Sequence, residues 1–351
     1  HILSDGVYIS SDIDGNVTIT AETARPKNMP VAGLQLRQTI FDGDKLICTS
    51  TNNCNAAFDG SFPEPVRINE ASLGSNTVTM KIPEPVLWDI GNPHLYSLTT
   101  ELIKAGEVIH TVINKFGVRK VEFTCDKGFF LNGRHVKLHG CCEHHDLGAL
   151  GAAVNRSAIK RKLTKLREMG INAIRTSHNM PAVEFMELCD EMGILVLSEG
   201  FDMWEKPKTD YDYARFFREW VDKDVASWVR RDRNHPCVIG WSVGNEIYDT
   251  HADDHGQEIA SRLLYLVRLH DPRANGYVTI GSNYMQWEGA QRCADIVKLA
   301  GYNYAERLYD EQHKAHPDWM IYGSETSSVV QSRGIYHFPY SEQILCEDDE
   351  Q

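Results

Sequence analysis

The sequence predicts two folded parts, an immunoglobulin-like β-sandwich over residues 1–115 and a (β/α)8 TIM barrel over residues 116–351. Short alternating strands fill the first part, apolar runs alternate with amphipathic segments in the second, and polar residues follow several of those runs. The chain has 351 residues, which is long for a single domain. We therefore expect a β domain followed by an α/β domain.

The first part shows the two-residue period of half-buried strands. Apolar and polar residues alternate over residues 17–20, 34–37 and 78–82. The turn-forming residues 42–44 and 52–53 separate such runs. Several short strands at this spacing are typical of an antiparallel sandwich.

The second part repeats a strand and a helix. The expected strands are residues 136–138, 173–175, 194–197, 238–243, 277–280, 296–299 and 320–322, and amphipathic segments cover 158–169, 183–192, 214–230 and 257–270. This repetition predicts a parallel sheet covered by helices. A doubly wound sheet is the alternative, but no Gly-rich phosphate loop follows an early strand.

The expected barrel has seven strands, because no eighth strand is evident after Glu325 and residues 346–351 form an acidic run. We expect the barrel to be incomplete at this end and to associate with a missing remainder. The chain begins at His1 without Met or a leader-like segment, which suggests an internal cut and leaves the cellular compartment unassigned.

Composition argues against several kinds of partner. The formal net charge of −13 disfavours nucleic acid, and no apolar run is long enough to span a membrane. The nine cysteines are scattered, and we expect most to be reduced, with a bridge between Cys48 and Cys54 as the less favoured alternative. A homo-oligomer is compatible with the sequence.

Two strand-end glutamates carry the strongest chemical signal. One apolar run ends in Asn245 and Glu246, and another ends in Glu325. The carboxyl ends of barrel strands form the mouth where barrel enzymes place their chemistry. Cleavage of a glycosidic bond needs two carboxyl groups, one protonated and one ionised. The pair therefore predicts a glycosidase, whereas a single strand-end glutamate would more simply be a surface or ion-paired residue.

The chain resembles glycoside hydrolase family 2, the β-galactosidase and β-glucuronidase family. The matching segments, in family order, are residues 87–89, 92–96, 116–119, 131–133, 174–178, 188–190 and 231–236. The resemblance implies a retaining exo-β-glycosidase with Glu246 as acid/base and Glu325 as nucleophile. It also implies that Arg175, His178, Asn245 and Tyr304 line the sugar site.

Further sugar contacts are expected at His145 or Asp146, which lie at the end of the first barrel strand. The stretch 201–204 looks like the metal-independent β-galactosidase branch, in which Asp202 and Trp204 would contact the sugar, although packing is the alternative for Trp204.

No metal and no cofactor are expected. The family's magnesium-dependent β-galactosidases carry a Glu-x-His pair where this chain has Met203 and Glu205. Residues 141–146 alternate in direction on a strand and cannot converge on one ion. His251 and His255 have helical spacing but no evident third ligand.

The expected substrate is a β-galactoside. A β-glucuronidase of the same family is the closest alternative, and a non-catalytic carbohydrate-binding protein is the alternative of another class. The latter should have lost one of the two glutamates, and both are present.

Overall fold

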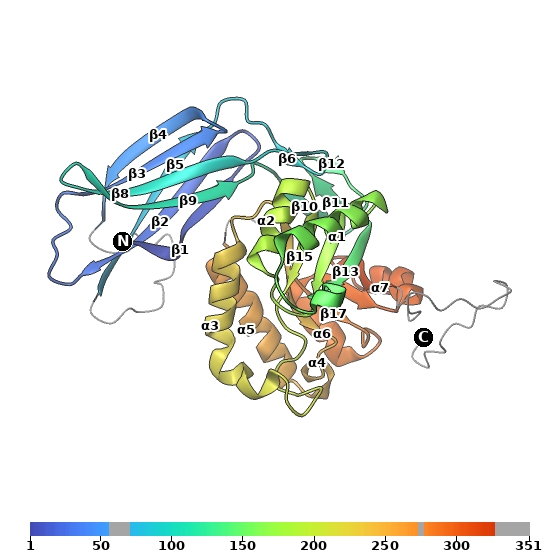
Figure 1. The fold of residues 1–351 in the computed structure, drawn as a ribbon. Coiled ribbons are helices and arrows are strands. Elements are labelled where there is room, and N and C mark those ends of the chain that lie inside the picture. Colours follow the sequence, from blue (N-terminus) through green and yellow to red (C-terminus); the bar gives the residue numbers. More distant parts are fainter. Residues whose placement is uncertain (56–70, 273–276, 327–351) are drawn as a thin grey trace.

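The computed structural model describes residues 1–55, 71–272 and 277–326. Its first part is a sandwich of two antiparallel sheets (Figure 1). One sheet has the order β1 (Ile2–Ser11), β2 (Asn16–Pro26), β5 (Ala71–Lys81), and the other has the order β4 (Lys45–Asn53), β3 (Leu34–Asp42), β8 (Tyr96–Lys104), β9 (Glu107–Phe116). The predicted β-sandwich is thus confirmed.

Alternation explains the core of the sandwich. Val17, Ile19 and Ala21 of β2 are fully buried, as are Leu36 and Ile40 of β3. Residues two apart on a strand share one face, so these side chains meet between the sheets. Residues 52–53, expected to form a turn, instead end β4 and pair with β3, because the strand continues to the edge of its partner.

Short elements join the sandwich to the second part. The two-stranded pair β6 (Trp88–Asp89) and β7 (Asn92–Pro93) is followed by the three-stranded sheet β10 (Val121–Thr124), β11 (Gly128–Leu131), β12 (Arg134–His135). The fully buried Trp88 donates its indole N–H to the carbonyl of Asp190 at 2.9 Å. Arg230 forms a buried ion pair with Glu22, so apolar and ionic contacts both fix the interface.

The second part is a curled seven-stranded parallel sheet. Its strands follow chain order: β13 (Gly140–His144), β14 (Ala173–Ser177), β15 (Leu195–Glu199), β16 (Val238–Asn245), β17 (Val278–Ser282), β18 (Leu299–Asn303), β19 (Met320–Glu325). This order is that of a barrel and differs from the reversing order of a doubly wound sheet. The Cys142 thiol of β13 lies 3.4 Å from the carbonyl of Ser324 in β19, so the outermost described strands approach each other.

Helices cover the outside of this sheet (Figure 1). They are α1 (Arg156–Glu168), α2 (Val183–Met192), α3 (Ala214–Asp232), α4 (Asp249–Ala252), α5 (His255–His270), α6 (Glu288–Val297) and α7 (Tyr309–Ala315), with 3-10 turns at Gly148–Leu150 and Glu306–Leu308. The four long amphipathic segments expected from the sequence correspond to α1, α2, α3 and α5. None of the described helices is both long and apolar enough to cross a bilayer.

Two predicted strands were misplaced. The first barrel strand is Gly140–His144 and not residues 136–138, because Val136 pairs with Phe129 of the small sheet. The sixth is Leu299–Asn303 and not residues 296–299, because Ile296 and Val297 are the last turn of α6. Both errors treated apolar residues of a neighbouring element as strand. The prediction that no eighth strand follows Glu325 concerns residues 327–351, including the acidic run 346–351, and these lie outside the described residues.

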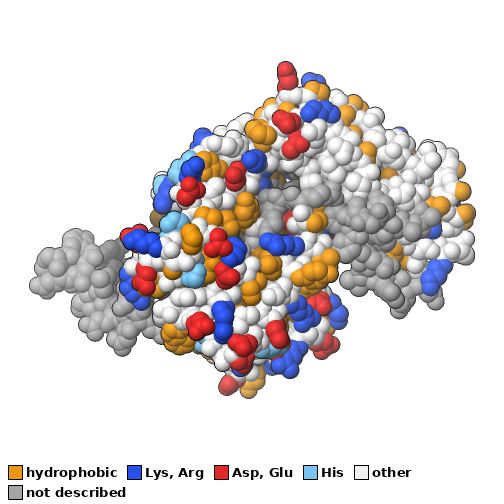
Figure 2. Space-filling view, turned by 180° about the vertical axis from the view of Figure 1, so that it is seen from behind, with side chains coloured by type: hydrophobic (Ala, Val, Ile, Leu, Met, Phe, Trp, Pro, Cys, Tyr) orange, Lys and Arg blue, Asp and Glu red, His pale blue; other side chains and the backbone are white. Residues whose placement is uncertain are grey.

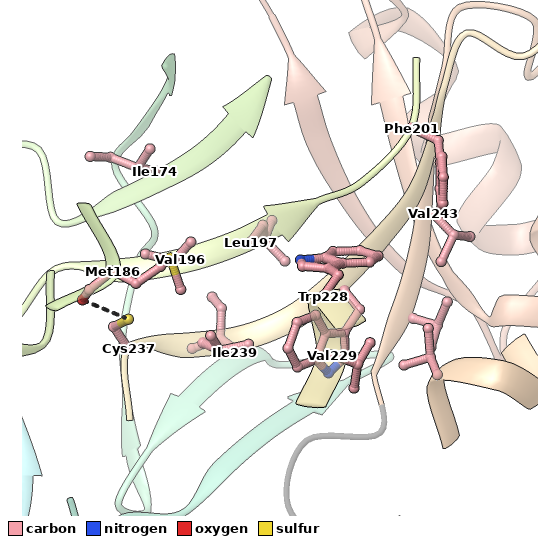
Figure 3. Packing of buried hydrophobic residues seen from close by; sticks show 14 of the residues in the cluster. Ile174, Met186, Val196, Leu197, Phe201, Trp228, Val229, Cys237, Ile239 and Val243 are labelled. Carbon is pink, nitrogen blue, oxygen red and sulfur yellow. Dashed lines mark hydrogen bonds between the residues drawn. The ribbon is translucent and has the colours of Figure 1, made fainter. Parts of the chain in front are cut away.

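Bulky side chains fill the space between the parallel sheet and the helices that cover it. Figure 3 shows Trp228 of α3 packed against strand residues such as Leu197 and Val243. The Trp228 indole N–H donates to the Ser198 hydroxyl at 2.9 Å, which satisfies its one polar atom. The ends of β15 and β16 therefore stand on a close-packed support. At the surface, acidic and basic side chains are interspersed (Figure 2).

Candidate active site

Glu246 and Glu325 both leave the carboxyl end of the parallel sheet. Glu325 is the last residue of β19, and Glu246 immediately follows β16. The backbone of Glu246 has a φ of 48°, which is uncommon for a residue with a side chain. Its N–H donates to the carbonyl of Gly281 in β17 at 2.8 Å. This bond fixes the direction in which the Glu246 side chain leaves the strand.

Two donors hold the carboxylate of Glu325. Arg175 donates to one oxygen at 2.7 Å, and the Tyr304 hydroxyl donates to the other at 2.6 Å. The side chain is 13% exposed. Burial works against ionisation, but the hydrogen bonds from Tyr304 and Arg175 outweigh it and hold the pKa of Glu325 below its ordinary value. Glu325 is therefore ionised near neutral pH.

Glu246 has the opposite environment. Burial raises its pKa, and the negative charge of Glu325 raises it further. A hydrogen bond of 2.9 Å from the Asn303 amide opposes these effects without cancelling them. The two carboxyl groups thus differ in the direction of their pKa shifts, which is how one site keeps one acid protonated and another ionised.

Arg175 connects the site. Its guanidinium is 4% exposed and donates to Glu199 at 2.9 Å, to Glu325, and to the Asn245 side-chain oxygen at 2.8 Å. The rigid fork of an arginine fixes the relative positions of the groups it binds. Arg175 therefore ties the end of β14 to β15, β16 and β19.

Glu199 holds two side chains of the site, Arg175 and His178. One of its oxygens accepts from Arg175 and from the Ser242 hydroxyl at 2.5 Å, and the other contacts His178 Nδ1 at 2.7 Å. The Nε2 atom of His178 lies 3.7 Å from Glu325. The carboxylate of Glu199, which is fully buried, thus orients both residues that face the Glu325 oxygen.

Asp202 lies beside Asn245. The Asn245 amide donates to Asp202 at 2.9 Å, and the ammonium of Lys208 donates to the same carboxylate at 2.7 Å. Lys208 also donates to the carbonyl of Asn245 at 3.0 Å. Seven predicted site residues are therefore connected directly or through Asn303 and Glu199: Arg175, His178, Asn245, Glu246, Tyr304, Glu325 and Asp202.

Three other predicted sugar contacts are placed differently. Trp204 is fully buried and donates its indole N–H to the carbonyl of Val243 at 2.7 Å. The ring packs under the strand, which is the alternative that the sequence left open for this residue. His145 contacts the Ala152 carbonyl at 3.0 Å, and Asp146 accepts from the N–H of Gly148 at 2.6 Å. Both side chains bond within their own loop, so the structure does not join them to the glutamate pair.

His144 occupies the place expected for His145. Its ring lies edge-on to His178, with centroids 5.1 Å apart. Successive residues of a strand point to opposite faces, so only one of two adjacent histidines can face the barrel interior.

Sequence reasoning singled out Glu199 and His144 only as polar residues at barrel strand ends, without a specific role, and it did not single out Asn303 or Lys208. Strand ends were the available signal for three of them, since Glu199, Asn303 and His144 each end a strand. Asn303 was missed because the sixth strand was placed too early. Lys208 lies in a loop, and no periodic pattern points to it.

The described residues contain one trio with metal-ligand chemistry, Asp190, His235 and Cys237, whose ligand atoms lie within 4.8 Å of one another. The Asp190 carboxylate already accepts from the N–H of Cys237 at 3.0 Å and contacts His235 at 2.5 Å. These partners explain the trio as a hydrogen-bonded support between α2 and β16.

Met203 and Glu205 stand where the metal-dependent β-galactosidases are expected to carry their Glu-x-His pair. Met203 offers no oxygen ligand, and the Glu205 carboxylate pairs with Arg218 at 2.5 Å and with His255 at 3.2 Å. The eight described cysteines are free thiols, including Cys48 and Cys54.

Two family models cover most of the chain. The model described as glycosyl hydrolases family 2 matches residues 1–119, and the model for the family 2 TIM barrel domain matches residues 121–320. A β-galactosidase of Bacteroides ovatus is 37% identical over 309 residues, which are 79% of this chain and 36% of that protein. A β-glucuronidase of Bacteroides fragilis is 29% identical over 353 residues, covering 92% of this chain and 50% of that protein.

Solved structures agree with these matches. The crystal structure of a family 2 member from Bacteroides cellulosilyticus superposes with a TM-score of 0.80 at 31% identity, over 93% of this chain and 40% of that one. The chain thus spans about a third to a half of the length of these relatives.

Proposed function

Because the chain belongs to glycoside hydrolase family 2, we propose that it carries the catalytic centre of a retaining exo-β-glycosidase acting on β-galactosides. One observation carries the proposal. Two partly buried glutamates leave the carboxyl ends of β16 and β19, where Arg175 and Tyr304 hold Glu325 and Asn303 contacts Glu246, and their pKa values are shifted in opposite directions, up for Glu246 and down for Glu325. A retaining glycosidase needs one carboxylic acid and one carboxylate across the bond that breaks.

In the first step, the Glu325 carboxylate attacks the anomeric carbon of the sugar. A bond forms between that carbon and a Glu325 oxygen while the bond to the leaving-group oxygen breaks. Glu246 gives its proton to the departing oxygen, so the leaving group departs as a neutral alcohol and Glu246 becomes a carboxylate.

In the second step, the ionised Glu246 takes a proton from water, and the water oxygen attacks the anomeric carbon. The bond between the sugar and Glu325 breaks, so Glu325 returns to its carboxylate form and Glu246 to its acid form. Two displacements at one carbon give a product with the configuration of the substrate. This course requires the two carboxyl groups to be about 5–5.5 Å apart.

The surrounding residues have distinct roles in this proposal. Arg175 and Tyr304 keep Glu325 ionised and hold both of its oxygens. Asn245 is positioned by Arg175 and Asp202 to hydrogen-bond the 2-hydroxyl, a contact that strengthens in the transition state. We assign His178 and Asp202 to other hydroxyls of the same sugar, because His178 lies beside Glu325 and Asp202 accepts a hydrogen bond from Asn245.

The charges around the pair favour a neutral sugar. Among the described residues of the site, the carboxylates of Glu199, Asp202 and Glu325 outnumber two permanent cations, Arg175 and Lys208, while Glu246 is the neutral acid in this proposal. Among the described residues, each of these cations already pairs with a carboxylate: Arg175 with Glu199 and Glu325, and Lys208 with Asp202. A uronic acid would add a further negative charge to a site in which carboxylates already outnumber these cations. A β-glucuronidase is the alternative, since one relative carries that name.

The test is a panel of 4-nitrophenyl β-glycosides on the protein that contains this chain, with Glu325→Gln as the inactive control. We expect the galactoside to have the highest kcat/KM, the glucuronide to be at least tenfold poorer, and NMR to detect the β-anomer as first product. Preference for the glucuronide would reverse the sugar assignment. First release of the α-anomer would contradict retention, and no turnover of any glycoside would favour a carbohydrate-binding role.

A further inference from the structure

Four aromatic rings gather in the two segments that follow β16 and β17 at the carboxyl end of the sheet, one of which contains α4. Tyr248 and His251 follow β16, and Tyr284 and Trp287 follow β17. The rings of His251 and Tyr284 have centroids 4.2 Å apart, those of His251 and Trp287 are 4.7 Å apart, and those of Tyr284 and Trp287 are 5.2 Å apart. Tyr248 lies 6.2 Å from His251 and 6.4 Å from Tyr284. These contacts define one aromatic cluster.

The cluster adjoins Glu246 and not Glu325. Tyr248 comes two residues after Glu246, and the N–H of Glu246 is bonded to the carbonyl of Gly281, three residues before Tyr284. The groups that hold Glu325 come from β14 and from the end of β18. The aromatic cluster is thus built on the two strands that position the acid/base.

The cluster presents aromatic surface to solvent. Trp287 is 47% exposed and Tyr248 is 39% exposed, whereas their neighbours Met285 and Ile247 are 1% and 0% exposed. Burial lowers the pKa of His251, which keeps this ring neutral at ordinary pH. The result is an uncharged surface of flat rings beside a strongly acidic site.

The support of the cluster is rigid. A Cβ atom at Gly289 would lie 2.7 Å from the carbonyl of Thr250, so the loop after β16 packs directly on the start of α6. The Gln257 amide contacts the carbonyls of Thr250 and Gly289 at 3.5 and 3.4 Å. The N–H of Trp287 donates to the carbonyl of Tyr284 at 2.9 Å. A surface held in this way loses little conformational entropy when a ligand binds.

We propose that Tyr248, Tyr284 and Trp287 form the subsite for the leaving group of the substrate. The proposal rests on the proposed function, because the group that receives a proton from Glu246 must leave on the Glu246 side. Aromatic faces bind other flat apolar faces by stacking. The chemistry recognised is therefore a leaving group with a flat apolar face, either an aryl ring or the apolar face of a second pyranose.

The test compares the single variants Trp287→Ala and Tyr248→Ala and the double variant that combines them with the unaltered protein. The substrates are three β-galactosides, which have a methyl, an aryl or a glucose leaving group. Tyr265→Ala is the matched control, since Tyr265 is an exposed aromatic on α5 outside the cluster. We expect kcat/KM for a flat leaving group to fall about tenfold in the double variant. Methyl galactoside should change less than about twofold, because its leaving group has no ring to stack.

The pattern of losses identifies the occupant. A loss confined to the aryl substrate supports an aryl leaving group, a loss confined to the disaccharide supports a sugar, and a loss for both supports the shared chemistry. Equal losses for all three substrates, or no loss for any, would overturn the subsite.

A fluorosugar separates this result from the proposed function. 2-Deoxy-2-fluoro-β-galactosyl fluoride has no ring in its leaving group, so its rate of inactivation should be the same in the cluster variants and the control. Normal inactivation without discrimination among leaving groups would overturn the subsite alone. Absence of inactivation in the unaltered protein would overturn the proposed function and the subsite with it.

Discussion

Arg175 of β14 and Glu325 of β19 form an ion pair of 2.7 Å at the centre of the site, although 150 residues separate them in the chain. The pair exists because the parallel sheet curls until its outermost described strands approach each other. The same guanidinium also fixes Glu199 and Asn245. The shape of the site therefore depends on Arg175, which also shares with Tyr304 the stabilisation of ionised Glu325.

Arg175→Met should lower kcat/KM for a β-galactoside by about a hundredfold or more, the usual cost of losing a preorganised charge-stabilising donor. Tyr304→Phe, which removes one neutral donor and keeps the ring, should cost less. Circular dichroism is the control for folding. Full activity of Arg175→Met would contradict the assigned role.

The pH profile of kcat/KM should be bell-shaped. Activity needs ionised Glu325, whose pKa is lowered, so it should fall only when the pH drops below the ordinary range of a glutamate. Activity also needs protonated Glu246, whose pKa is raised, so it should fall as the pH rises through that higher value. In Tyr304→Phe the acidic limb should move to higher pH while the alkaline limb stays. Movement of the alkaline limb instead would reverse the two roles.

In Glu246→Ala, the first step should persist for substrates with good leaving groups, because their departure needs little acid assistance. Because the second step then lacks its base, azide should raise turnover of an activated aryl galactoside and give a β-galactosyl azide. Glu325→Gln is the contrasting variant, since no added anion can produce this β-azide through its covalent intermediate. Failure of azide to rescue Glu246→Ala would remove the acid/base assignment.

Chelation should leave activity nearly unchanged. Met203 and Glu205 stand where the resemblance predicts a magnesium-binding pair in metal-dependent family members, and Glu205 is engaged by Arg218 and His255. EDTA treatment followed by dialysis should reduce kcat less than about twofold. A large loss that magnesium restores would contradict this reading of the loop.

The sequence was informative where a regular pattern carried the signal. Alternation in β2 and β3 predicted the sandwich, and the repetition of strands and helices predicted the barrel. Glu246 and Glu325 could be selected because each ends an apolar run. These patterns are local, so they survive without knowledge of tertiary contacts.

The rest of the site depends on contacts that no local pattern encodes. Lys208 reaches Asp202 from an irregular loop, and the choice of His144 over His145 depends on strand direction. The sequence left two readings open for Trp204, because an aromatic residue near a strand end can either bind a sugar or pack, and only the surroundings distinguish the two. Its complete burial under the Val243 carbonyl is a tertiary property.

The most direct test of the account is to trap the glycosyl-enzyme with 2-deoxy-2-fluoro-β-galactosyl fluoride and to locate the label by peptide mass spectrometry. The fluorine slows both steps, and the good leaving group keeps the first fast enough for the intermediate to accumulate. We predict one fluorogalactosyl group per active site, attached to Glu325, and no label in Glu325→Gln. A label on Glu246, or rapid hydrolysis without any covalent adduct, would contradict the assignment of Glu325 as nucleophile.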